Sequence, residues 1–332
     1  MNAPIAADHQ TETKLSDYNG IAIDNAAKLH KFRQSTQQPD RADLRSNSWS
    51  RRSIPQRLAP TASTSRWATA QSLRASSITL ANTASNSNTS ASLGTVLHNV
   101  DLTAHLSPEL TQLIRDTLLE RKVIFFRNQH LGEDQQTTFG RQFGSLDAFP
   151  FGAPGDNPFI LKIVHGPGSP GTENGWHTDV TWMERPPLGS IAQCVVTPPY
   201  GGDTLFADSH AAYLGLPSTL REQIDHLSGV NDYRIFIEGR GRGAMPDALI
   251  AAVKERIPYG VDHPLVRTHP ETGKPALYLH RGFLPHESLF DRRAGETLDR
   301  DESKRIVTAL LAQHNRPEYI CRFRWQTDSI AF

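Results

Sequence analysis

The sequence predicts a mainly β-stranded domain with flanking helices, preceded by a long polar tail. The main observation is a series of short runs rich in β-branched and aromatic residues, separated by glycine and proline. These runs cover residues 93–97, 123–126, 159–164, 190–196, 204–206, 263–268, 276–279, 319–325 and 329–332. Many short strands of this kind are typical of a sandwich or a barrel. The second observation is that helical patterns interrupt the strands at only a few places.

The first of these helices begins at Ser107 and Pro108. A serine hydroxyl caps the first turn of a helix, and proline fits its first position. Apolar residues then recur at helical spacing as far as Leu118. Further helices are expected at residues 133–143, 218–227 and 301–314. Gly144 is expected to end the helix at 133–143, and Ser218 to cap the helix at 218–227.

Residues 1–90 differ in composition from the rest of the chain. They hold 11 basic and 6 acidic residues, a net charge of +5, whereas residues 91–332 hold 24 basic and 29 acidic residues, a net charge of −5. The segment ends in a Ser-, Thr- and Asn-rich run with too little apolar surface to offset the entropy lost on ordering. We therefore expect a disordered, low-complexity tail over residues 1–90 and one domain over residues 91–332.

Charge and hydropathy exclude several classes of protein. Lys+Arg and Asp+Glu both number 35, so no net charge attracts the chain to nucleic acid or to a membrane surface. The basic stretch at residues 41–74 has scattered charges and only Trp49 and Trp67 as aromatic residues, a weak pattern for nucleic-acid binding. No apolar run approaches the roughly 18 residues of a membrane span. Cys194 and Cys321 fall in strand-like runs, where we expect buried free thiols and a reducing, cytoplasmic location.

His177 and Asp179 form the one His-x-Asp pair of the chain. In an extended strand, residues two apart point to the same face, so the imidazole and the carboxylate can reach one metal ion. With a second histidine they would complete the 2-His-1-carboxylate site of non-haem iron(II) oxygenases. However, a chain with 14 histidines and 21 aspartates is expected to contain about one such pair by chance. Taken alone, the pair is more often a histidine in a turn beside a capping aspartate.

The surroundings of the pair carry a family resemblance. The sequence GWHTDVTW at residues 175–182 is followed by PP at 186–187 and GGDTLF at 201–206. In the same order come VIFFRNQ at 123–129, RQFG at 141–144, HPLVRTHP at 263–270 and RFRW at 322–325. Together these segments resemble the taurine dioxygenase and 2,4-dichlorophenoxyacetate dioxygenase family of iron(II)/2-oxoglutarate-dependent oxygenases. The resemblance implies a double-stranded β-helix, or jelly-roll, core.

The resemblance also implies roles for individual residues. His177 and Asp179 match two ligands of Fe(II), and Thr204 matches the residue whose hydroxyl contacts the cosubstrate 2-oxoglutarate. Val180 matches a substrate-pocket position, although a buried valine describes it as well. Phe149 and Gly152 fall where taurine dioxygenase grips its sulfonate with a histidine and a tyrosine, which argues against taurine itself. The implied reaction uses O2 to hydroxylate a small organic acid, a sulfonate or an alkyl sulfate, with release of succinate and CO2; a homo-oligomer is left open.

The end of the chain departs from the family pattern. The family strand that matches residues 329–332 is followed by a Trp-Asp-Asn-Arg segment, the second metal-binding histidine and an arginine for the cosubstrate. We therefore expect a C-terminally incomplete domain, without its last strands and without a third metal ligand. Loss of the arginine contact alone would reduce the binding free energy of 2-oxoglutarate by about 1.5–3 kcal/mol. An inactive jelly-roll binding module is the alternative function. We interpret five later histidines of the domain as surface or core-edge residues: His263, His269, His280, His286 and His314.

Overall fold

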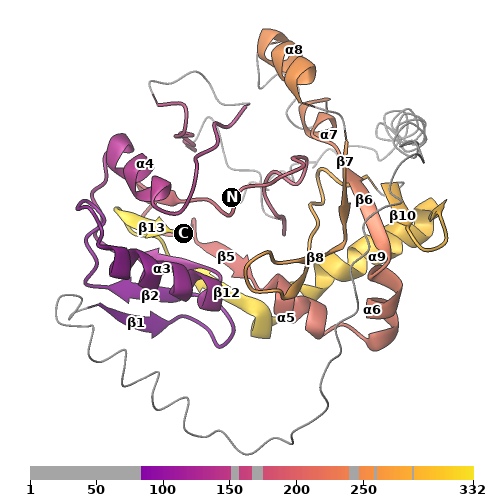
Figure 1. Cartoon of the computed structure of the whole chain (residues 1–332), viewed down its shortest axis with the longest axis horizontal. Helices are drawn as coiled ribbons and strands as arrows, with labels where there is room; N and C mark the ends of the chain where they lie inside the picture. The colour runs from indigo at the N-terminus through magenta and orange to yellow at the C-terminus, as the bar shows by residue number, and fades with distance from the viewer. Residues whose placement is uncertain (1–83, 151–156, 167–174, 239–246, 258–259, 286–287) are drawn as a thin grey trace, which may run out of the picture.

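A computed structural model describes residues 84–150, 157–166, 175–238, 247–257, 260–285 and 288–332. Within these residues no helix is both long enough and apolar enough to cross a membrane. Two sheets lie side by side, and a two-stranded ribbon lies between them (Figure 1). The expected mainly β domain with helices around its sheets is thus confirmed at this level.

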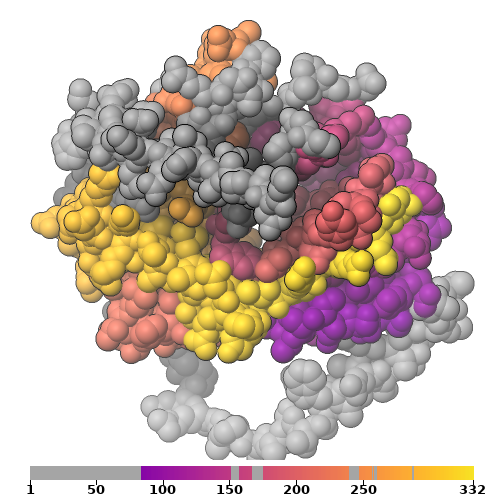
Figure 2. Space-filling view, turned by 180° about the vertical axis from the view of Figure 1, so that it is seen from behind, coloured from indigo at the N-terminus to yellow at the C-terminus, as the bar shows by residue number. Residues whose placement is uncertain are grey.

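A five-stranded sheet is built from both ends of the described chain. Its strands are β1 (Ser85–Asn88), β2 (Thr95–His98), β3 (Ile124–Phe126), β13 (Ser329–Ala331) and β4 (Ala192–Cys194), in this spatial order. Strands β2 and β3 are parallel, and the other pairs are antiparallel. Ile330 pairs with Phe126 on one side and with Gln193 on the other. Seen from behind, the yellow C-terminal segment lies between the purple N-terminal segment and the red segment that follows residue 190 (Figure 2).

The middle strand β3 is buried on both faces. Ile124 and Phe126 point into one apolar cluster and Phe125 into another, because alternate residues of a strand face opposite sides. The first cluster is covered by α3 (Pro108–Arg121) and by α4 (Glu133–Arg141). As expected, Ser107 accepts a hydrogen bond from the Leu110 amide and Pro108 occupies the first turn of α3.

The two-stranded ribbon covers the other face of β3. It consists of β5 (Thr204–Ala207) and β12 (Ile320–Phe323), which pair antiparallel with Thr204 opposite Phe323. The ring of Phe323 stacks on Phe125, with centroids 3.9 Å apart and planes at 5°. The short 3-10 helix η3 (Pro317–Tyr319) leads into β12. The ribbon is therefore fixed to the sheet through an aromatic stack.

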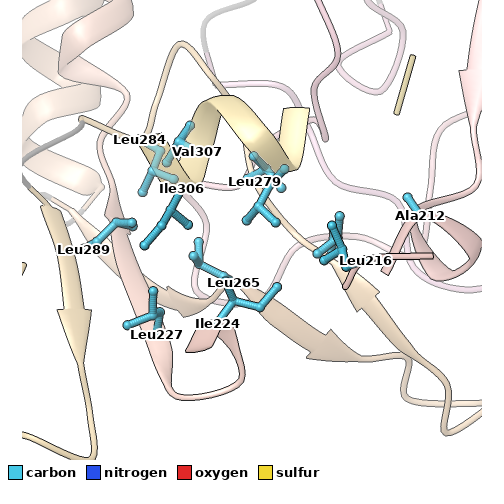
Figure 3. Packing of buried hydrophobic residues seen from close by; sticks show 12 residues of the cluster. Ala212, Leu216, Ile224, Leu227, Leu265, Leu279, Leu284, Leu289, Ile306 and Val307 are labelled. Atoms are coloured by element: carbon cyan, nitrogen blue, oxygen red, sulfur yellow. The ribbon is translucent and has the colours of Figure 1, made fainter. Parts of the chain in front are cut away.

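The second half of the domain has its own core. A four-stranded sheet orders β11 (Glu296–Thr297), β10 (Leu289–Asp291), β6 (Leu227–Asn231) and β7 (Val261–Pro264), and β8 (Val266–Thr268) pairs with β9 (Pro275–Leu277). The helices here are α5 (Ser209–Leu214), α6 (Ser218–Ile224), α7 (Arg234–Glu238), α8 (Asp247–Arg256) and α9 (Arg300–Gln313). Ile306 and Val307 of α9 gather with Leu265, Leu279 and Leu284 in one buried cluster (Figure 3). Leu279 and Leu284 of this cluster lie on either side of the turn at residues 281–283.

The structure differs from the sequence-based expectations at several places. Residues 159–164 form no strand, and Ile163 and Val164 are 70% and 81% exposed, because no neighbouring strand pairs with them. Pro217, rather than Ser218, is the N-cap residue of α6, and Leu227 already belongs to β6. Gln142, not Gly144, caps the end of α4.

The boundary of the polar tail also differs. Ser85–Asn88, inside the segment expected to be disordered, form β1 and pair with β2, because backbone hydrogen bonds do not require apolar side chains. The rest of the predicted tail, residues 1–83, lies outside the described residues. Cys321 is a buried free cysteine as expected, whereas Cys194 is half-buried.

Candidate functional site

The candidate metal pair lies on a turn rather than in a strand. His177 forms an isolated antiparallel bridge with His280, and Asp179 begins the turn that follows. The His177 Nε2 and Asp179 Oδ1 atoms are 3.3 Å apart, so the turn brings the two side chains together where we expected a strand to do so. The Asp179 side chain is 71% exposed. The pair is thus open to solvent on one side.

The hydrogen bond of His177 Nδ1 determines which ring nitrogen faces Asp179. Its Nδ1 lies 2.8 Å from the Gly175 carbonyl oxygen, which can only accept, so Nδ1 carries a proton. In the neutral imidazole Nε2 then presents a lone pair to a carboxylate oxygen, and two acceptors at this distance need a proton or a cation between them. When Nε2 also carries a proton, its hydrogen bond holds the pKa of Asp179 below its usual value, while burial acts in the opposite direction.

The ligand atoms His177 Nε2 and Asp179 Oδ1 are placed so that both can bind a single metal ion. First-row metal ions bind imidazole nitrogen and carboxylate oxygen at about 2.0–2.2 Å, and a second-shell carbonyl that fixes the histidine tautomer is a common feature of such sites. Atoms 3.3 Å apart can both reach one ion at these bond lengths. Within the described ranges, no group of three or more His, Cys, Asp or Glu side chains is placed to hold a metal ion.

His280 is a neighbour of the pair that the sequence analysis missed. Its ring lies 5.2 Å from the His177 ring and stacks on Phe283 with centroids 3.9 Å apart. The Gly282 amide donates to His280 Nδ1 at 2.9 Å. Burial, and then repulsion from His177, lowers the pKa of His280 to about 4, so the ring is neutral at pH 7. About 100 residues separate the two histidines, and no spacing in the sequence could have indicated this contact.

The residues next to Asp179 are anchored in the core. Val180 has φ of +49°, in the left-handed region that a β-branched residue rarely occupies, and its side chain packs against the apolar cluster of Trp182 and Tyr233. Trp182 is buried, with its ring 5.7 Å from that of Tyr233. Trp176 instead donates its indole N–H to Asn315 Oδ1 at 2.7 Å. Anchors on both sides therefore hold the turn.

Thr204 begins β5 directly after a glycine turn. Gly201 and Gly202 have φ of +77° and +73°, which glycine adopts without steric cost. The Thr204 hydroxyl oxygen accepts a hydrogen bond from the Trp325 indole at 2.8 Å. Asp203 accepts a 2.7 Å hydrogen bond from Arg322 on the partner strand. Among the described residues, the hydroxyl is thus held by Trp325 alone, and the Asp203–Arg322 pair is a separate contact of the same strands.

The two remaining candidate residues, Val180 and Phe149, lie in different segments of the chain. Val180 follows Asp179 directly, but its side chain packs against the cluster of Trp182 and Tyr233, and its role in a substrate pocket stays a prediction. Phe149 belongs to a segment without regular structure after α4, and its side chain is 40% exposed. Gly152 lies outside the described residues.

Similarity to known proteins identifies the class of enzyme to which the chain belongs. The chain is 32% identical to an alkylsulfatase from Acinetobacter baylyi, over 72% of this chain and 73% of that protein. It is also 32% identical to an alpha-ketoglutarate-dependent sulfate ester dioxygenase from Pseudomonas putida, over 72% of this chain and 77% of that protein. A solved taurine dioxygenase from Burkholderia xenovorans superposes with a TM-score of 0.58 and 34% identity, covering 75% of this chain and 78% of that one. The class is that of the alpha-ketoglutarate (2-oxoglutarate)-dependent dioxygenases.

The family follows from a match to most of the domain. Residues 85–332 match the model of the taurine catabolism dioxygenase TauD, TfdA family. The chain belongs to this family, as the sequence motifs predicted. The match begins at residue 85, where β1 begins, rather than at residue 91.

Proposed function

We propose that His177 and Asp179 bind Fe(II) and that Thr204 binds 2-oxoglutarate, for the hydroxylation of a small sulfated or sulfonated organic acid. The observation that carries this proposal is the 3.3 Å separation of His177 Nε2 and Asp179 Oδ1, with the His177 tautomer fixed by the Gly175 carbonyl. The sheets belong to a double-stranded β-helix, and the enzyme works in the cytoplasm. Free cysteines among the described residues are consistent with a reducing compartment.

The chain's own residues bind and orient the reactants. Iron(II) with 2-oxoglutarate and O2 supplies the oxidising chemistry, in which the cosubstrate is converted to succinate and CO2. His177 provides a neutral nitrogen and Asp179 a negative charge, so the site binds a cation while retaining open positions. Thr204 donates its hydroxyl proton to a cosubstrate carboxylate. Val180 and Phe149 contact the substrate. The anchors of the 179–183 turn hold the ligand pair at a fixed separation before the metal arrives.

The substrate proposal is supported by the relatives that act on sulfate esters. Two of them, an alkylsulfatase and a sulfate ester dioxygenase, are similar to this chain along more than two thirds of its length. Hydroxylation of the carbon that bears the ester oxygen yields an unstable product, which releases sulfate and an aldehyde. Alkyl sulfates are therefore the first substrates to test, and alkyl sulfonates the second.

Turnover and metal binding test the proposal separately. Succinate release is measured with Fe(II), 2-oxoglutarate and a panel of alkyl sulfates and sulfonates, and Mn(II) binding is measured by calorimetry without O2. We expect His177→Ala and Asp179→Ala to lower both turnover and metal affinity at least about 100-fold, since loss of even a second-shell partner costs about 10–100-fold.

The chain offers a matched control. His130 and Asp328 form another His–Asp pair, with Nδ1 and Oδ2 3.1 Å apart, and the His130 side chain is 85% exposed. His130→Ala should retain turnover and metal affinity within about twofold. Equal turnover in wild type, His177→Ala and Asp179→Ala would contradict the proposal. Metal and 2-oxoglutarate binding without any turnover would favour the binding-module alternative.

A further inference from the structure

A hydrogen bond outside the metal pair fixes the direction of the Thr204 hydroxyl. The Trp325 indole nitrogen lies 2.8 Å from Thr204 Oγ1. An indole N–H can only donate, so the Thr204 oxygen is the acceptor. A hydroxyl has a single proton, and this proton then has to point away from Trp325. Within the described part of the chain, Trp325 is the one hydrogen-bond partner of this hydroxyl, and Thr204 is partly exposed, so the proton is available to a ligand.

The indole packs against Phe323, and two further contacts hold the Phe323 ring in place. Trp325 packs edge-on against Phe323, with ring centroids 4.9 Å apart at 82°. Phe323 in turn stacks on Phe125 of the central strand, and the Arg127 guanidinium lies over the Phe323 ring at 4.1 Å from its centroid. Since Phe323 is also the strand partner of Thr204, the ribbon itself sets the distance between indole and hydroxyl.

We propose that Trp325 is a positioning residue that commits the Thr204 hydroxyl to donate to a carboxylate of 2-oxoglutarate. The inference rests on the proposed function, in which Thr204 contacts this cosubstrate. Without the indole, the hydroxyl is free to rotate and to use its proton on a nearby backbone carbonyl, as threonine side chains commonly do. A carboxylate ligand would then have to compete for the donor, and its affinity would fall.

The test is a double-mutant cycle on 2-oxoglutarate binding. Trp325→Phe keeps an aromatic ring against Phe323 but removes the N–H, and Thr204→Val removes the hydroxyl while keeping its shape. Binding of 2-oxoglutarate to the Mn(II)-loaded full chain is measured by calorimetry without O2. We expect Thr204→Val to weaken binding about tenfold, as for loss of a hydrogen bond to a charged group, and Trp325→Phe about three- to tenfold. The double variant should bind as Thr204→Val does, because Trp325 acts only through the hydroxyl.

Two controls separate positioning from packing. Arg322→Gln loosens the same strand pair without touching the hydroxyl, and it should bind 2-oxoglutarate within about twofold of wild type. Thr204→Ser retains the hydroxyl and should recover most of the affinity lost in Thr204→Val. Thermal unfolding of each variant checks that the ribbon is intact.

Each outcome has a defined meaning. Unchanged affinity in Trp325→Phe, or additive losses in the double variant, would overturn the inference while leaving the proposed function standing. A wild-type chain that binds Mn(II) but no 2-oxoglutarate would overturn both. Should Trp325→Phe fail to fold, the indole N–H resonance of wild-type Trp325 gives the answer by NMR. Addition of 2-oxoglutarate must then shift this resonance, and an unmoved resonance contradicts the positioning role.

Discussion

Two regions of the domain carry the candidate site, and they are built differently. The ribbon of β5 and β12 presents Thr204 from regular strands that rest on the stacked rings of Phe323 and Phe125. The turn that holds His177 and Asp179 has one isolated bridge and a left-handed residue, Val180. The ribbon therefore gains its order from paired strands and packing, whereas the turn depends on single anchors around it.

The comparison indicates that the ribbon contributes mainly to stability, whereas the residues of the turn contribute mainly to function. A side chain in the aromatic stack supports the fold, and its loss is expected to unfold the ribbon. His177 and Asp179 place a nitrogen lone pair beside an exposed carboxylate, an arrangement that contributes little to the fold without a cation. Functional residues of this kind are commonly neutral or even costly for stability.

The largest expected effect on stability comes from removing the stacked ring of Phe323. Phe323→Ala should lower the free energy of unfolding by about 3–5 kcal/mol, because the buried ring leaves a cavity against Phe125. His177→Ala should lower it by less than about 1 kcal/mol. Urea denaturation of the metal-free protein measures both values. Equal losses would show that the turn carries as much of the fold as the ribbon does.

A smaller effect on stability is expected from His263, which contacts Met183 next to the turn. His263 Nε2 is 2.8 Å from the Met183 carbonyl oxygen. Burial lowers the pKa of His263, an effect that nearby Arg267 reinforces and the Met183 carbonyl and Asp262 oppose. Because the folded pKa lies below the unfolded value of about 6.5, this contribution to stability is complete above pH 6.5 and is lost as the pH falls through the folded pKa.

His263→Gln tests this pH dependence. Between pH 7.5 and 5.5 we expect the free energy of unfolding to fall less in the variant than in wild type. For a single titrating site, the two slopes can differ by at most about 1.4 kcal/mol per pH unit. Urea midpoints at several pH values measure the slopes. Parallel pH profiles in the two proteins would show that His263 does not contribute to the acid sensitivity of the turn.

The smallest effect is expected at the edge of the ribbon. Arg322 and Asp203 form a 2.7 Å contact, and the Arg322 side chain is 69% exposed. Exposed ion pairs contribute about 0–1 kcal/mol, so Arg322→Gln should lower the free energy of unfolding by less than about 1 kcal/mol. A salt series checks the assignment, since the small difference should disappear at high ionic strength. A loss comparable to that of Phe323→Ala would mean that the ribbon depends on this pair instead of on its rings.

The sequence predicted most of the elements but not what brings them together. Local signals located α3 through Ser107 and Pro108, and the continuous apolar run at 123–126 located β3. The apolar run at 159–164 failed as a strand, because a strand requires a partner that local composition does not specify. Motifs singled out His177, Asp179 and Thr204 as candidates. The contacts of His280 with His177 and of Trp325 with Thr204 join distant segments, so only the tertiary structure reveals them.

The position of β13 also constrains when the protein can fold during its synthesis. β13 lies between β3 and β4, and Ile330 pairs with Phe126, about 200 residues earlier. The five-stranded sheet cannot close until residue 331 has left the ribosome. At about 5–20 residues per second, β3 therefore waits some 10–40 seconds for its partner. During that interval the edge of β3 that later pairs with β13 has unpaired backbone groups, which can pair with another chain.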